Sequence, residues 1–255
     1  MIRVCVAGVT GWTGRPVAGA IEAADDLELV AGVARSDPEH FSTVAEALEA
    51  VPADVLVDYT HAESVGANVR VALEHGVGVV VGSSGLTAED YAAIDTLARE
   101  RGVGVIGAGN FSLSAALVLR FALEAAEHFD FWEVIDYASA GKEDAPSGTA
   151  RELAERLAAV HRPALGVSLA DVLGAPNARG ATVAGTQVHS LRLPGFVVST
   201  QVVFASGGER LTLRHDAGPT PGPYVAGTLL AIRALPGRIG LTRGLDRILG
   251  DEPVA

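Results

Sequence analysis

One loop of this sequence gathers an ammonium group, two hydroxyls and a glycine in a short span. It runs from Lys142 to Thr149 and reads Lys-Glu-Asp-Ala-Pro-Ser-Gly-Thr. Ser147 or Asp144 is placed to cap a following helix, and the backbone N–H groups of Ser147, Gly148 and Thr149 would then face an anion. Capping alone explains the hydroxyls but not the lysine at the start of the loop. The pattern therefore predicts recognition of a carboxylate.

A second group of residues with chemical potential lies near the N-terminus. Gly8, Gly11 and Gly14 follow an apolar strand and precede a helical segment. Glycine permits a tight turn and a close approach of the backbone to a pyrophosphate, and the helix N-terminus supplies free N–H groups. The Gly-x-x-Gly-x-x-Gly spacing differs from the usual dinucleotide fingerprint, Gly-x-Gly-x-x-Gly. We predict a dinucleotide-binding turn, with a purely structural glycine turn as the alternative.

The end of the second expected strand indicates which dinucleotide is bound. An NAD site usually carries an acidic residue there, which binds the ribose hydroxyls. Here the strand is followed by Arg35, and the first carboxylate is Asp37. Because a guanidinium pairs well with a phosphate, Arg35 favours NADPH, whose ribose carries a 2′-phosphate, over NADH. A solvated surface arginine is the alternative interpretation.

The elements that must position these residues alternate regularly through the first half of the chain. β-Branched apolar runs predict strands over residues 2–7, 27–33, 55–59, 77–81 and 103–107. Helical periodicity predicts helices over residues 16–24, 41–50, 64–75 and 88–101. Such alternation is typical of a parallel sheet covered on both faces. We predict the α/β fold class, with a Rossmann-type doubly wound parallel sheet.

The rhythm changes in the second half of the chain. A long helix is expected over residues 112–129, and a strand over 131–137. Strands are also expected over 183–192, 197–204 and 210–214, and a closing helix over 224–234. We expect a dinucleotide-binding domain of residues 1–111 plus 217–255, with a second α+β domain of residues 112–216 that carries the substrate-binding loop.

Composition excludes several classes of function. The net charge of -12 and the absence of a basic run argue against a nucleic-acid partner. The N-terminus does not resemble a signal peptide, and no apolar run is long enough for a bilayer, so we expect a cytoplasmic protein without a membrane partner. Cys5 lies inside the first apolar strand and is expected to be a small core residue. No cluster of side chains predicts a metal site.

Taken together, the motifs resemble those of the dihydrodipicolinate reductase family over nearly the whole chain. The strongest match is the loop from Lys142 to Thr149. Further matches are the opening glycine turn, Val57-Asp-Tyr-Thr60, Gly82-Ser-Ser-Gly85, Ala108-Gly-Asn-Phe-Ser112, His189-Ser-Leu-Arg-Leu-Pro-Gly195 and Leu213-Arg-His-Asp216.

The resemblance assigns roles to individual residues. It implies that the cofactor is held by Gly8, Val9, Thr10, Gly11, Trp12, Thr13 and Arg35, and on the nicotinamide side by Gly82, Ser83, Ser84, Ala108, Gly109, Asn110 and Phe111. It implies that Lys142 is catalytic and that the substrate is bound by Ser139, Ser147, Gly148 and Thr149. The family fold also implies that the second domain assembles a homotetramer.

One departure from the family pattern concerns the proton donor. Family members carry a His-His pair shortly before the lysine, and the first histidine is regarded as the donor. Ala138 and Ser139 stand at these places. Alanine has no titratable group, so the usual mechanism does not carry over unchanged. Tyr59, Ser139 and a water held by Lys142 are open alternatives, as is Tyr137, although strand alternation points Tyr137 to the face opposite Ala138.

The resemblance implies an NAD(P)H-dependent reductase that converts 4-hydroxy-tetrahydrodipicolinate to tetrahydrodipicolinate in lysine and diaminopimelate biosynthesis. The substrate would be a small cyclic dicarboxylate. A reductase of the same fold for another cyclic imine or carbonyl compound is one alternative, and a catalytically silent NADP(H)-binding regulator is another. A short-chain reductase is disfavoured, because Tyr137 is followed by Gly141 where that class needs a lysine.

Overall fold

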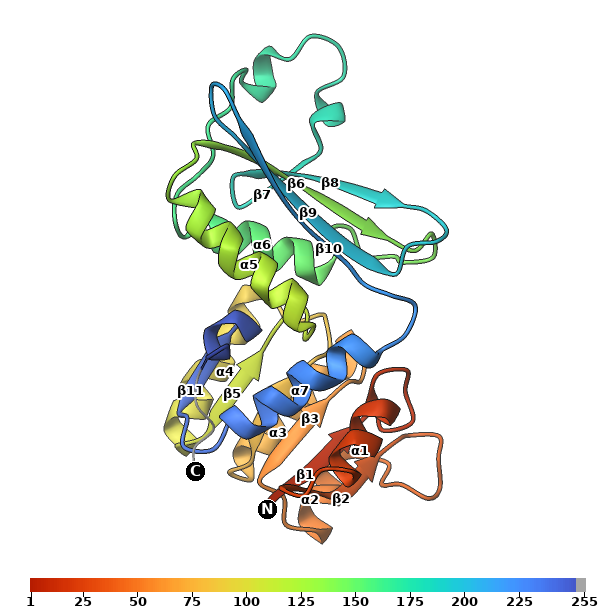
Figure 1. Cartoon of the computed structure of the whole chain (residues 1–255). Helices are drawn as coiled ribbons and strands as arrows, with labels where there is room; N and C mark the ends of the chain where they lie inside the picture. Colours follow the sequence, from red (N-terminus) through yellow and green to blue (C-terminus); the bar gives the residue numbers. More distant parts are fainter. Residues whose placement is uncertain (251–255) are drawn as a thin grey trace. The chain divides into compact units, whose positions relative to one another are not determined.

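The chain folds into two units, which are described here from a computed structural model (Figure 1). The structure describes residues 1–250. The first unit comprises Met1–Leu113 and the chain from Pro221 onward, and the second comprises Ser114–Thr220. The expected boundaries, after residues 111 and 216, lie two and four residues from these positions.

The first unit is built on a parallel sheet. Its strands are β1 (Ile2–Ala7), β2 (Leu27–Val33), β3 (Val55–Asp58), β4 (Gly78–Val81), β5 (Gly104–Gly107) and β11 (Gly240–Arg243). They lie in the order β11-β5-β4-β3-β1-β2, and every neighbouring pair is parallel. The carboxyl ends of these strands therefore meet at one edge, where doubly wound sheets bind ligands.

Helices cover this sheet in a Rossmann-like arrangement (Figure 1). They are α1 (Gly14–Glu22), α2 (Val44–Ala50), α3 (Ala62–Glu74), α4 (Ala88–Arg101) and α7 (Gly222–Ala234). Apolar side chains of α2, α3 and α4 share one core with strand residues, whereas α1 and α7 contact each other. The closing helix α7 thus returns to the first unit, as the sequence predicts.

Helix ends in this unit follow local capping chemistry. Helix α4 has the predicted bounds, because Thr87 and Asp90 form a capping box and Gly102 ends the helix in a left-handed conformation. Helix α2 begins three residues later than expected. Phe41 is held in a β-bridge to Val33, and the Thr43 side chain caps the helix. The sequence does not predict strand β11, because Gly240–Arg243 lacks the apolar run that marks the other strands of this sheet.

The second unit is a mixed sheet with two helices on one face. Its strands are β6 (Phe131–Ala138), β7 (Ala181–Val183), β8 (Thr186–Arg192), β9 (Val198–Ala205) and β10 (Arg210–Asp216), in the order β10-β9-β6-β8-β7. Strands β6 and β8 are parallel and the other pairs are antiparallel. Its helices are α5 (Leu113–Ala126) and α6 (Gly148–Ala158), which share an apolar core with β6, β8 and β9.

Residues 186–192 of the expected strand over 183–192 form β8, and its first residue, Val183, instead ends β7. Ala184 and Gly185 have φ angles of 50° and 94°, so the chain reverses between β7 and β8. In β6 buried and half-buried residues alternate, so Trp132, Val134, Asp136 and Ala138 face the helices. Among residues 1–250 no α-helix lies on the other face of this sheet (Figure 1), where Arg179 of a short 3₁₀ helix (Pro176–Arg179) bonds to Glu133.

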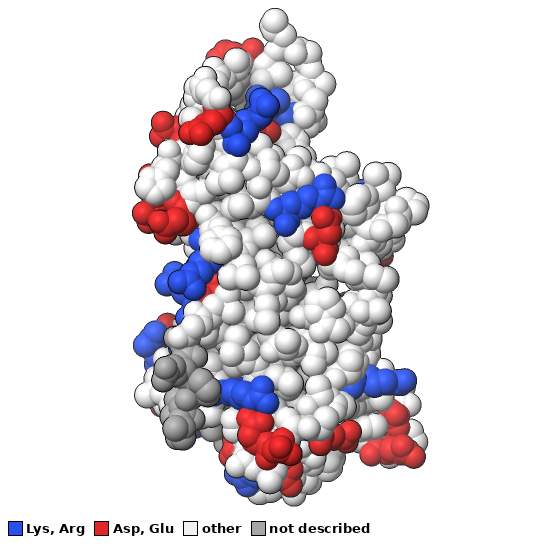
Figure 2. All heavy atoms as spheres, viewed as in Figure 1, with Lys and Arg blue, Asp and Glu red and all other residues white. Residues whose placement is uncertain are grey.

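Several smaller expectations concern single residues and surfaces. Cys5 is fully buried in the first unit's core, and this burial raises the pKa of its thiol to about 12. Within residues 1–250 no helix is long and apolar enough to cross a bilayer. On the face shown in Figure 2, Lys and Arg side chains are scattered among acidic ones instead of forming one basic patch.

Candidate active site

The glycine turn after β1 has the shape that a dinucleotide needs. Gly8 adopts a φ of 80°, and a Cβ at Gly8 would collide with the carbonyl of Tyr59. A Cβ at Gly14, the first residue of α1, would collide with the carbonyl of Gly8. The Thr13 side chain does not cap α1, so the helix N-terminus is not occupied by that hydroxyl. These residues fit a bound pyrophosphate.

The remaining residues of the turn differ in exposure. Val9 is buried beneath the turn, whereas 54% of Trp12 is exposed. The Trp12 ring lies 5.9 Å from that of Tyr224, measured between centroids. Thr10 and Gly11 are half-buried between them. The turn therefore presents polar backbone and an aromatic side chain at its outer surface.

Arg35 lies just beyond β2, at the same edge of the sheet. It is exposed, and its guanidinium donates a hydrogen bond to the hydroxyl of Ser64, at 3.2 Å. The nearby carboxylate of Asp37 instead lies 3.4 Å from the His40 ring. Because Asp37 pairs elsewhere, the guanidinium of Arg35 is available to an anion.

The expected nicotinamide-side residues follow β4 and β5 at this edge. Gly82 packs so closely on the ring of Tyr59 that a Cβ would not fit there. The Tyr59 ring also meets Phe111 edge-on, with centroids 6.2 Å apart. Ser84 and Gly109 are exposed, whereas Ala108 and Phe111 are buried. The Asn110 side chain accepts a hydrogen bond from the backbone of Ser112. The structure thus gathers all the expected cofactor residues along one sheet edge.

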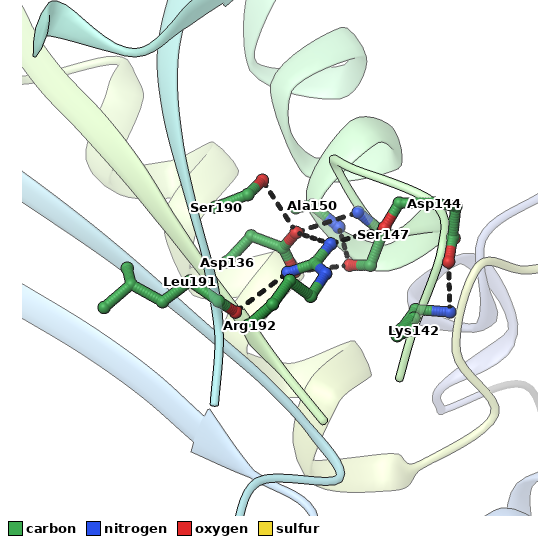
Figure 3. A network of polar contacts seen from close by, with 8 residues as sticks. All are labelled: Asp136, Lys142, Asp144, Ser147, Ala150, Ser190, Leu191 and Arg192. Carbon is green, nitrogen blue, oxygen red and sulfur yellow. Dashed lines mark hydrogen bonds and ion pairs between the residues drawn. The ribbon is translucent and has the colours of Figure 1, made fainter. Parts of the chain in front are cut away.

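In the second unit a buried carboxylate fixes the start of α6, the helix that follows the loop from Lys142 to Thr149 (Figure 3). Asp136 is fully buried and accepts hydrogen bonds from the Ser147 backbone at 2.9 Å and its hydroxyl at 2.7 Å. Arg192 and Ser190 donate to the same carboxylate, at 2.9 and 3.0 Å. Arg192 also donates to the Asp144 carbonyl. This network holds the loop from both ends.

The hydroxyl of Ser147 is therefore used for hydrogen bonds inside the protein. The Ser147 side chain is 1% exposed, donates to Asp136 and accepts the Ala150 N–H as the cap of α6. Gly148 and Thr149 are partly exposed in the first turn of α6. A Cβ at Gly148 would meet open space. Among the expected substrate residues of this loop, Gly148 and Thr149 are thus the accessible ones.

The ammonium group of Lys142 lies at the other end of the loop. It pairs with Asp144 at 2.7 Å, and its side chain is 26% exposed. Figure 3 shows this pair beside the Asp136 network. An exposed ion pair of this kind contributes little to stability, roughly 0–1 kcal/mol. Lys142 can therefore exchange Asp144 for a substrate anion at small cost.

The two positions at which the family resemblance implies histidines differ in environment. Ala138 is fully buried at the end of β6, and Ser139 is exposed. Tyr137 lies on the opposite face, as expected, although it is half-buried there and not in the core. Its ring stacks on Phe196 and its hydroxyl donates to Gln201. The Tyr137 side chain therefore points away from the face of the sheet on which Ala138 lies, and it cannot act as a proton donor there.

Other candidate proton donors are engaged or neutral. The hydroxyl of Tyr59 lies 2.6 Å from that of Thr228, and burial raises the Tyr59 pKa. His215 is buried against Ser114, and burial lowers its pKa below the usual 6.5, so it is neutral near pH 7. His61 is exposed at the start of α3.

Two buried carboxylates in the structure received no role from the sequence. Asp58 is the last residue of β3 and Asp136 lies near the end of β6, and both are fully buried. Each follows a run of apolar strand residues. The position of each carboxylate at the end of an apolar strand can be seen in the sequence. It indicates a structural or functional role, because a buried carboxylate needs several hydrogen-bond donors.

Comparisons with known proteins agree with these motifs. The family model for the N-terminus of dihydrodipicolinate reductase matches residues 2–111, and the model for its C-terminus matches residues 114–249. The 4-hydroxy-tetrahydrodipicolinate reductase of Cutibacterium acnes is 38% identical and covers 99% of this chain and all of its own length. That of Nocardia farcinica is 41% identical over 97% of this chain and 98% of its own.

A solved structure shows the same similarity in three dimensions. The dipicolinate-bound dihydrodipicolinate reductase from Paenisporosarcina sp. TG-14 is 29% identical. It superposes with a TM-score of 0.78 and covers 97% of this chain and 99% of its own.

Proposed function

The chain belongs to the dihydrodipicolinate reductase family, and we propose that it reduces 4-hydroxy-tetrahydrodipicolinate to tetrahydrodipicolinate in lysine and diaminopimelate biosynthesis. It is an NAD(P)H-dependent oxidoreductase with a Rossmann fold. The observation that carries the proposal is the loop from Lys142 to Thr149, which keeps an ammonium group and an accessible helix N-terminus on a rigid support.

The residues of each unit have distinct parts in the proposed reaction. The first unit binds the cofactor at its glycine turn, where the backbone of α1 meets the pyrophosphate. When bound, the nicotinamide supplies the hydride. In the second unit Gly148 and Thr149 bind a substrate carboxylate, and Lys142 neutralises negative charge on the substrate or its anionic intermediate. Ser139 contributes a hydroxyl next to this loop. Ser147 holds the loop in position through its hydrogen bonds to Asp136.

The proton comes from water in this proposal. Conversion of 4-hydroxy-tetrahydrodipicolinate to tetrahydrodipicolinate adds one hydride and one proton and releases the 4-hydroxyl group as water, and Ala138 has no proton to give. Lys142 is the one loop residue with several N–H donors at a half-exposed position. A water held by its ammonium group can deliver the proton, because water becomes more acidic beside a fixed positive charge.

Turnover gives the test of this function. Purified protein, NADPH and freshly generated 4-hydroxy-tetrahydrodipicolinate should lose absorbance at the nicotinamide band at a rate proportional to enzyme concentration. The product should be tetrahydrodipicolinate by mass spectrometry. A rate no higher than that of an enzyme-free blank would reject the assignment.

A second candidate function keeps the fold and the cofactor but changes the substrate. It is favoured by Ala138, because a buried methyl group replaces a polar contact at the family's histidine position. The substrate would then be another cyclic imine or carbonyl compound with a carboxylate. A panel of such compounds, each assayed by NADPH oxidation, separates the two: the second function requires a compound with a higher kcat/KM than 4-hydroxy-tetrahydrodipicolinate.

NADPH should bind more tightly than NADH because of Arg35. We expect Arg35→Ala to raise the Kd of NADPH at least about tenfold, since a charged hydrogen bond contributes roughly 1.5–3 kcal/mol. The Kd of NADH should change less than about twofold, as it lacks the 2′-phosphate. Ser64→Ala, which removes only the hydroxyl that holds Arg35, is the control. Equal losses for both cofactors, measured by nicotinamide fluorescence, would contradict this role.

We propose that the uncovered face of the mixed sheet mediates assembly into a homotetramer, and that the enzyme works in the cytoplasm. That face carries a hollow of about 470 Å³, bordered by Phe131, Ile135 and Val203 among others. Ile135→Asp should dissociate the assembly, because it places a charge among apolar contacts. Phe121→Asp changes an exposed position on α5 and is the control. Light scattering after size exclusion reads the mass, and an unchanged mass for Ile135→Asp would reject this interface.

A further inference from the structure

The buried carboxylate of Asp58 has no role in the mechanism above. Asp58 ends β3 and is fully buried at the carboxyl edge of the first unit's sheet. It belongs to the same edge as the glycine turn and the loop after β4. A buried ionised group is costly unless its surroundings satisfy it, so its presence there calls for a physical reason.

The hydrogen bonds around Asp58 are those that a carboxylate accepts. Its Oδ1 accepts from the backbone of Thr60 at 3.0 Å, from the Thr60 hydroxyl at 2.7 Å and from the Ser83 hydroxyl at 2.6 Å. Its Oδ2 accepts from the side-chain amide of Asn68 at 2.8 Å. A backbone N–H and an amide N–H can only donate, so both oxygens act as acceptors. All of these donors are uncharged, so they solvate the negative charge without cancelling it.

The position of this charge relates it to the cofactor. Strand β3 lies between β1, which leads into the glycine turn, and β4, which leads into Gly82 and Ser83. Ser83 is one of the residues proposed for the nicotinamide side, and its hydroxyl is bonded directly to Asp58. The carboxylate thus lies one side chain below the surface on which the nicotinamide is proposed to rest.

From this arrangement we infer that Asp58 is a positioning residue whose negative charge, held by Ser83, Thr60 and Asn68, favours the oxidised cofactor over the reduced one. The inference rests on the proposed binding of NADP(H) at this edge. The nicotinamide ring is neutral in NADPH and carries a positive charge in NADP⁺, after the hydride and its two electrons have passed to the substrate. A fixed negative charge nearby stabilises the second state and so favours hydride donation.

The test compares two affinities and does not depend on turnover. Asp58→Asn removes the charge with little change of shape. We expect the ratio of the Kd for NADP⁺ to the Kd for NADPH to rise about 20-fold, as follows for charges roughly 8–10 Å apart at an effective dielectric constant near 20. Nicotinamide fluorescence gives the Kd of NADPH, and calorimetry gives that of NADP⁺.

Two further variants separate charge from structure. Ser83→Ala removes a hydrogen bond but keeps the carboxylate, so both affinities should fall by the same factor. Asn68→Lys keeps Asp58 and places an ammonium group beside its Oδ2, and should raise the ratio in the same direction as Asp58→Asn. If Asp58→Asn does not fold, Asn68→Lys still tests the inference.

The outcomes are distinct. A ratio that stays within about twofold of wild type in both Asp58→Asn and Asn68→Lys would overturn the inference and leave Asp58 a structural residue of the loop. Wild-type protein that binds neither NADPH nor NADP⁺ would instead overturn the proposed function on which the inference rests.

Discussion

Replacement of Lys142 by alanine is expected to lower kcat/KM for 4-hydroxy-tetrahydrodipicolinate by about 10³-fold. Removal of one group that stabilises developing negative charge typically costs about 10²–10³-fold in rate, and Lys142 is also proposed to hold the proton-delivering water. The KM for NADPH should change little, because the residues proposed to bind the cofactor belong to the first unit. Initial rates at varied substrate and cofactor concentrations provide the measurement.

Two variants control for effects on the loop itself. Lys142→Arg keeps the positive charge and should recover part of the activity. Glu143→Gln alters an exposed neighbour in the same loop and should behave like wild type within about twofold, as surface changes usually do. Retention of more than about a tenth of wild-type activity in Lys142→Ala would remove this lysine from the mechanism.

Replacement of Asp136 by alanine is expected to destabilise the second unit by about 3–5 kcal/mol. The change leaves the guanidinium of Arg192, which has a side chain only 16% exposed, without its carboxylate partner. It also frees the start of α6, because Ser147 loses both of its bonds to Asp136. Gly148 and Thr149 would then no longer be held in place, so carboxylate binding should weaken as well.

The chain offers a clean reporter for this measurement. It has two tryptophans, Trp12 in the first unit and the buried Trp132 in the second. In a Trp12→Phe background, urea unfolding followed by Trp132 fluorescence reports on the second unit. Ser190→Ala removes one peripheral donor to Asp136 and should cost about 1 kcal/mol. A loss below about 1 kcal/mol for Asp136→Ala would mean that the network is not what holds the loop.

The features predicted correctly from the sequence are those with a local physical cause. The parallel sheet follows from apolar runs alternating with periodic helices, and the bounds of α4 follow from its cap residues. The glycine turn is recognisable because Gly8 and Gly14 lie where a Cβ would strike the backbone. The sequence patterns that predict these features lie within a few positions of one another, although the carbonyl that excludes a Cβ at Gly8 belongs to the distant Tyr59.

Most of the features that the sequence does not predict depend on pairing between distant segments. Strand β11 exists because it pairs with β5, more than a hundred residues earlier. The hairpin between β7 and β8 is local, but the segment over 183–192 has a continuous strand-like composition that hides the turn at Ala184 and Gly185. Asp136 gains its role from Ser147, Ser190 and Arg192, which lie on two other elements. Sequence pattern alone could place Asp136 on a strand but could not assign these partners.

The structure also describes the two positions at which the family resemblance implies histidines. Ala138 lies in a fully buried position at the end of β6, so the protein is packed around a small side chain there. Ser139 is exposed and keeps a hydroxyl. The site proposed here therefore depends on one cation, Lys142, and on the backbone of α6, and it has less positive charge than the family pattern implies.

The most direct test of the central claim is calorimetric binding of pyridine-2,6-dicarboxylate to the protein saturated with NADPH. Wild-type protein is expected to bind this dicarboxylate at one site per chain. Lys142→Ala and Thr149→Val should each weaken binding at least about tenfold, as expected when a charged hydrogen bond is lost. Wild-type protein that does not bind this dicarboxylate, or two variants that bind it as tightly as wild type, would contradict the claim that this loop is the substrate site.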